Sequence, residues 1–173
     1  RTYLSQYPRS KNAYDLKFYL ADCLYGSRQF PEAAASYEAV IANKSDDKYL
    51  EKSAWLAALT REEMVKTLAR DGALPAVPSL LGDEYVQPEP DASNGKDNDG
   101  KLIVIKGRDI PQEVEELIAA RKVYSLLPKK YRNQEKPAQL HVMIYKTGEH
   151  YFDFKHYDEA RKWFTLLIED HPK

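Results

Sequence analysis

The chain has 173 residues, of which 43% are apolar and 31% are charged, so it can bury a core and is not disordered as a whole. Its formal net charge of −1 creates no overall field that would favour nucleic acid, and we expect no nucleic-acid partner. No long apolar run is present, so no segment is expected to span a bilayer. The single cysteine, Cys23, cannot form an internal disulfide, and we expect it to be a packed thiol.

The first predicted elements are a helix end and a helical hairpin. Tyr3–Tyr7, followed by Pro8, is typical of the last turn of a helix. Apolar residues at helical spacing then predict helices over Ala13–Ser27 and Pro31–Asn43. Pro31 suits the first turn of the second helix, where a missing N–H costs nothing.

The middle of the chain predicts a second hairpin whose two helices are far apart in the sequence. Lys48–Arg70 has the apolar spacing of a long amphipathic helix. Asp71–Arg108 contains four of the ten prolines and a Gly/Asn/Asp-rich centre, which favours turns, with Leu102–Ile105 as a short extended segment. Asp109 then reads as the N-cap of a helix over Pro111–Leu127. The simplest interpretation is a hairpin with residues 71–108 inserted at its turn.

The last stretch, His141–Pro172, predicts two short helices joined at a corner formed by Lys155–Tyr157. Gly148 and Ala160 are small residues at positions where the two helices must approach closely. A larger side chain there would force the helices apart, and Pro172 is expected to end the second helix.

The last stretch repeats the first hairpin at a constant offset of 127 residues, without a gap. A fixed register over two helices and their turn is a stronger signal than a loose amphipathic pattern. The matched pairs are Leu20-Ala21 with Thr147-Gly148, Leu24-Tyr25 with Tyr151-Phe152, Phe30 with Tyr157, Glu32-Ala33 with Glu159-Ala160, Tyr37 with Phe164, and Val40-Ile41 with Leu167-Ile168.

This repeated phrase resembles the tetratricopeptide (TPR) repeat, and in particular the TPR proteins of the Gram-negative cell envelope. The residues that carry the likeness are Tyr7-Pro8, Ser10, Tyr19-Leu20-Ala21, Phe30, Glu32, Ala33 and Tyr37. The departures are Asp22, Cys23 and Ser45. The resemblance is to periplasmic coordinators of the Tol–Pal type, barrel-assembly lipoproteins and gliding-machinery proteins. It implies an all-α, right-handed α-solenoid with a periplasmic or outer-membrane-associated location.

The resemblance implies a single TPR solenoid fragment. We expect residues 1–8 to end a preceding repeat, residues 11–45 and 137–172 to form complete repeats, and residues 47–128 to form a repeat interrupted by residues 71–108. Because the chain begins at Arg1 and shows no polar capping helix after Pro172, we expect a piece of a longer protein. Its oligomeric state is left open.

In a TPR array, the first helix of each repeat lines a concave groove, and the resemblance places eight residues of this sequence there. An aromatic and acidic surface of this kind would suit a protein or peptide partner with basic and apolar anchors. The expected function is a non-catalytic protein–protein interaction scaffold. The alternative, that the aromatic members simply pack between repeats, stays open. The groove residues are Asp15, Phe18, Asp22, Tyr25, Val142, Tyr145, Glu149 and Phe152.

The sequence leaves two rival functions to consider, a metal site and a cytosolic adaptor. His150 and Asp153 are three residues apart, a spacing that could chelate a metal in an enzyme or accessory domain, but no HExxH motif is present. We therefore interpret the histidines as exposed and expect no metal, cofactor or catalytic residue. Asp97–Gly100 lacks the first and last ligands of a calcium loop. A cytosolic adaptor TPR would grip a carboxylate with Lys and Arg, whereas the groove positions here are acidic or aromatic.

Overall fold

The computed structural model describes residues 12–43, 47–82, 107–132 and 138–170, together with Leu4, Gln6, Tyr7 and Ser10. Within these residues every regular element is helical, which confirms the all-α class. The predicted extended segment Leu102–Ile105 and the helix-ending Pro172 lie outside the described residues. The elements are α2 (Ala13–Gly26), α3 (Phe30–Ile41), α4 (Leu50–Arg70), α5 (Pro78–Leu81), α6 (Gln112–Ser125), the 3-10 turn η2 (Lys129–Tyr131), α7 (Ala138–Asp153) and α8 (Tyr157–Asp170).

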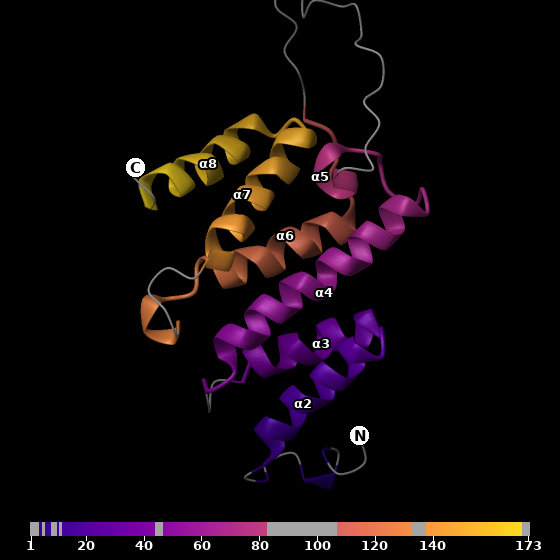
Figure 1. Cartoon of the computed structure of the whole chain (residues 1–173), viewed down its shortest axis with the longest axis vertical. Coiled ribbons are helices and arrows are strands. Elements are labelled where there is room, and N and C mark those ends of the chain that lie inside the picture. The colour runs from indigo at the N-terminus through magenta and orange to yellow at the C-terminus, as the bar shows by residue number, and fades with distance from the viewer. Residues whose placement is uncertain are drawn as a thin grey trace, which may run out of the picture.

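The long helices stack in chain order along the molecule, with α2 near one end and the α7–α8 pair at the other (Figure 1). Each of them packs mainly against the helix before it and the helix after it. Three apolar clusters fill the layers between successive helices, and α4 contributes to all three. No described helix is long and apolar enough to cross a membrane.

The 127-residue repeat is present in the structure as two hairpins of the same geometry. Arg28 and Lys155 both adopt a left-handed backbone, with φ of 59° and 63°, at equivalent points of the two turns. The same backbone hydrogen bonds surround them: Gln29 N–H to Leu24 O matches His156 N–H to Tyr151 O, and Arg28 N–H to Tyr25 O matches Lys155 N–H to Phe152 O. The matching register therefore reflects one structural unit used twice.

The structure differs from the prediction at the start of the inserted segment and at the start of the helix that follows it. Its first part is ordered: α5 packs against α4 and α7. Leu74 and Val77, which precede α5, and Leu80 within it are buried in the same apolar cluster as residues of α6. The predicted N-cap of α6, Asp109, was also wrong, and this residue is exposed. The N-cap is Pro111, whose backbone is extended (φ −57°, ψ 148°), so the helix begins at Gln112 rather than at Pro111 as predicted.

The close approach of α7 and α8 depends on Gly148. A Cβ built on this residue would lie 2.5 Å from Cε1 of Phe164, which is closer than real Cβ contacts allow. We therefore expect Gly148→Leu to lower the free energy of unfolding by about 2–3 kcal/mol, measured by urea denaturation, because the inserted side chain must push the helices apart.

Gly26→Leu is the matched control for this substitution. Gly26 ends α2, and a Cβ there meets nothing within 4 Å, so this variant should be neutral or slightly stabilising. The double variant Gly148→Leu/Phe164→Ala should recover part of the loss, since the ring that clashes is gone. Equal effects of the two single leucine variants would show that α7 and α8 are not held at this distance.

Candidate functional site

In the first hairpin, the start of α4 covers the predicted groove residues. Phe18 is only 1% exposed, because its ring stacks on Tyr49 with the ring centroids 4.1 Å apart and the planes 5° from parallel. The expectation that Phe18 contacts a partner is therefore wrong. The aromatic residue is instead an internal packing residue, which was the alternative left open by the sequence.

The acidic residues of the same hairpin have partners within the chain. Asp15 accepts a hydrogen bond from Lys48 Nζ at 3.0 Å. Asp22 accepts one from the Tyr37 hydroxyl at 2.6 Å, and Lys52 Nζ lies 3.8 Å from its other oxygen. Burial, followed by the Asp22 carboxylate, raises the pKa of Tyr37 well above its ordinary value.

Tyr25 and Cys23 are the other residues of α2 with a sequence-based expectation. Tyr25 is half-buried and packs on Phe30, with the ring centroids 5.7 Å apart. Cys23, expected to be packed, is exposed and belongs to none of the three apolar clusters. In the first hairpin, then, α4 covers Phe18 and its lysines pair with Asp15 and Asp22, while Tyr25 packs within the hairpin.

In the last hairpin, the equivalent residues are open to solvent. Val142, Tyr145 and Phe152 are 49%, 47% and 54% exposed, and Glu149 is half-buried among them. They recur at helical spacing and form one stripe along α7, which we call the α7 face. Hydrogen bonding to Glu149, and then the charge of that carboxylate, raise the pKa of Tyr145. On α8, Ile168 is also exposed, by 70%.

A second feature, missed at the level of sequence, is a buried charge cluster between α4, α6 and α7. Glu62 accepts hydrogen bonds from Arg121 Nη2 at 2.8 Å and from Lys146 Nζ at 2.5 Å, and Lys66 Nζ lies 2.9 Å away. Arg121 is 1% exposed. Burial raises the pKa of Glu62, but the cations of Arg121, Lys146 and Lys66 outweigh it and hold the pKa below its usual range.

His150 lies buried beside this cluster, and neither of its ring nitrogens has a hydrogen-bond partner among the described residues. Burial, followed by the positive charge of Arg121, lowers the pKa of His150 to about 3. The interpretation of His150 as an exposed histidine is therefore wrong. Helical spacing alone placed it beside Asp153, but the register of α7 turns its ring toward α4 and α6.

Asp153, the other residue of the metal hypothesis, is engaged elsewhere. Its Oδ2 accepts a hydrogen bond at 2.7 Å from the backbone N–H of Ser79 in α5. His141 and His156 are half-buried, and His156 Nε2 lies 2.8 Å from Arg108 O. Among the described residues, no three His, Cys, Asp or Glu side chains are grouped as metal ligands. His171 lies outside the described residues.

The charge cluster had a signal in the sequence. Arg121 follows Val114, Leu117 and Ile118 on the apolar side of its helix, and Glu62 follows Ala58 in the same way. A charged residue in a buried register indicates a buried partner of opposite charge. The cluster borders a cavity of about 390 Å³ beneath α5, lined in part by Lys66, Lys146 and Glu149. Since both lysines already pair with Glu62, the cavity does not present them as a free anion site.

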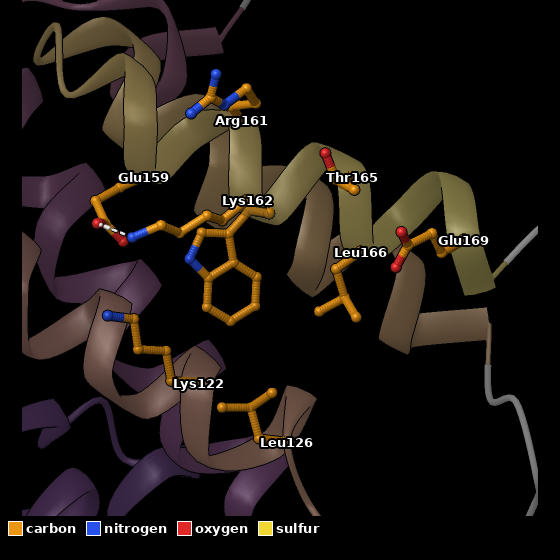
Figure 2. Close-up of a pocket in the computed structure, with 9 residues that line it drawn as sticks. Lys122, Leu126, Glu159, Arg161, Lys162, Thr165, Leu166 and Glu169 are labelled. Atoms are coloured by element: carbon orange, nitrogen blue, oxygen red, sulfur yellow. Dashed lines mark hydrogen bonds and ion pairs between the residues drawn. The ribbon is translucent and has the colours of Figure 1, made fainter.

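A larger, open hollow of about 600 Å³ lies between α6 and α8 (Figure 2). Its lysines have partners: Lys162 binds Glu159 at 2.6 Å, and Lys122 donates to the Tyr151 hydroxyl at 2.8 Å. Leu126 and Leu166 line the hollow to one side of these charges (Figure 2). It contains none of the predicted site residues and has the character of an outer surface between stacked helices.

No protein-family model matches the sequence, and neither the curated proteins nor the solved structures give a significant match.

Proposed function

We propose that this protein is a non-catalytic protein–protein interaction scaffold, built as a TPR-type right-handed α-solenoid, that binds a partner segment through the α7 face. The observation that carries the proposal is the exposure of Val142, Tyr145 and Phe152 in one stripe with Glu149. Large apolar side chains gathered on one exposed face mark an interaction surface rather than an ordinary one. Tyrosine is also common at the energetic centre of interfaces.

The repeated hairpin supports the solenoid part of the proposal. Two copies of one unit, at the two ends of a chain whose helices stack in sequence order, are typical of repeat architectures. The proposed place of action, a complex of the Gram-negative cell envelope, rests on the resemblance carried by the Tyr7-Pro8 phrase and its continuation. The inserted segment is a second candidate contact, since α5 lies against α7.

Site-specific photo-crosslinking tests the proposal. A photoreactive phenylalanine at position 145 should link the chain to a defined protein of the source cell's envelope fraction, identified by mass spectrometry. The same amino acid at position 123 is the control, because Val123 is 44% exposed on α6 and lines a hollow shared with α3 and α4 rather than with α7. Crosslinking from position 145 is repeated in a form with residues 83–106 replaced by a short linker. Loss of the crosslink in that form would show that the insertion takes part in partner binding. Equal labelling from positions 145 and 123, or no defined product from either, would contradict the proposal.

A further inference from the structure

The repeat provides an internal template for what binds the α7 face. Phe18 and Asp22 of α2 are equivalent to Tyr145 and Glu149 of α7, and the two turns have the same hydrogen bonds. An aromatic ring followed four residues later by a carboxylate is thus presented twice on the same scaffold. One copy is covered by another helix and the other is open.

The covering of the first copy has three components. Tyr49, just before α4, stacks on Phe18. Lys52, three residues later, places its Nζ 4.7 Å from the centre of the Phe18 ring and 3.8 Å from Asp22. Ala57 then lies fully buried against α2 and α3, where a small side chain lets α4 approach. Stacking, a cation over an aromatic ring and close helix packing each favour the covered state.

The two copies differ in sequence, and these differences predict how a helix bound to the α7 face would differ from α4. Asp15, which binds Lys48, is replaced by Val142 in α7. A lysine before the aromatic residue would lose its partner there, whereas an apolar side chain would pack on Val142. Tyr145 and Glu149 retain the aromatic and acidic character of Phe18 and Asp22.

We propose, resting on the proposed interaction function, that the α7 face binds an amphipathic helix of a partner protein whose first turn reads apolar–aromatic–x–x–Lys or Arg. A small residue about two turns later lets that helix approach α7 and α8. The occupant is a different protein rather than a second copy of this chain. The described segment that supplies this template, Tyr49 to Ala57, is already packed on its own first hairpin, so a second copy of this chain does not offer it.

A labelled peptide with the sequence of residues 47–61 carrying Lys48→Leu is the probe, and its binding to the whole chain is followed by fluorescence anisotropy. We expect it to bind more tightly than the unmodified peptide. Tyr145→Ala in the protein, or Tyr49→Ala in the peptide, should each weaken binding about tenfold, which corresponds to about 1.4 kcal/mol. Val142→Ala should weaken binding less, and Val123→Ala, of similar exposure, should have no effect.

A charge exchange tests the orientation of the helix. Glu149→Lys should weaken binding of the peptide, and the peptide with Lys52→Glu should restore it, after circular dichroism has shown that the variant is folded. Binding that ignores both Tyr145→Ala and Glu149→Lys would overturn the inference, as would self-association of the chain abolished by Tyr145→Ala. If position 145 crosslinks an envelope protein but the peptide does not bind, the inferred binding motif is wrong. The proposed scaffold function would still be supported by the crosslink.

Discussion

Replacement of Glu62 by Gln is expected to lower the free energy of unfolding by about 3–5 kcal/mol, because it removes the carboxylate that compensates a buried guanidinium. Arg121 is 1% exposed, and its Nε and Nη1 have no hydrogen-bond partner among the described residues. Loss of the Glu62 charge would leave that cation buried and uncompensated. Urea denaturation followed by circular dichroism measures the change.

Two companion variants separate this explanation from a general sensitivity of α4. Glu63→Gln, one residue further along, removes a carboxylate whose contact with Lys66 is partly exposed, and it should cost less than about 0.5 kcal/mol. Glu62→Leu/Arg121→Met removes both buried charges and should lie within about 1 kcal/mol of the native protein. If Glu62→Gln costs no more than Glu63→Gln, the buried pair does not stabilise the fold as argued.

The protein is also expected to lose stability in mild acid because His150 must stay neutral in the folded state. Its pKa is about 3 in the fold and 6.5 in the unfolded chain, so the unfolded state binds more protons as the pH falls through this window. The contribution of His150 is fully present above pH 6.5 and decreases by about 2–3 kcal/mol between pH 7 and pH 4.5. Its charged neighbours are Glu62 on α4, Arg121 on α6 and Lys146 on α7.

Glu62 acts in the same direction but at lower pH. Its folded pKa lies below the ordinary 4.5, so its contribution is present above that value and is lost as the pH falls below it. The two groups can therefore be separated. His150→Leu should make the free energy of unfolding nearly independent of pH between pH 6.5 and pH 4.5, while the loss of stability below pH 4.5, which Glu62 causes, should remain. His141→Gln, half-buried on the same helix, is the control. An unchanged profile in His150→Leu would contradict the assignment.

The sequence determined the helices and their repetition. Apolar spacing predicted α2, α3, α4, α6, α7 and α8 within a few residues, because each helix must bury one stripe whatever it packs against. The 127-residue register predicted two equivalent hairpins for the same reason: the turn and the close contact at Gly148 are properties of the local chain. The predicted N-cap of α6, Asp109, was two residues away from the observed one, Pro111. Helix ends are uncertain on this scale, because neighbouring residues can each act as the cap.

The start of the inserted segment could not be predicted from local chemistry. Leu74, Val77 and Leu80 recur every third residue, but Pro75 and Pro78 interrupt them and indicate a loop. This stretch is ordered because it packs on apolar residues of α4, α6 and α7. In addition, the Asp153 carboxylate accepts a hydrogen bond from the Ser79 N–H. These partners are distant in the sequence, so the outcome is a property of the assembled fold.

Only the tertiary structure decided which copy of the repeated face is open. Phe18 and Tyr145 occupy the same position of the same motif, and both are aromatic residues followed four residues later by a carboxylate. The first is buried because α4 lies over it, while no described helix takes the place of α4 over the second, which packs on Phe164 of its own hairpin and stays 47% exposed. Exposure depends on what packs next to a residue rather than on the residue itself. For that reason the sequence could propose the site residues as a set, but the packing of α4 assigned one half to the core and left the other at the surface.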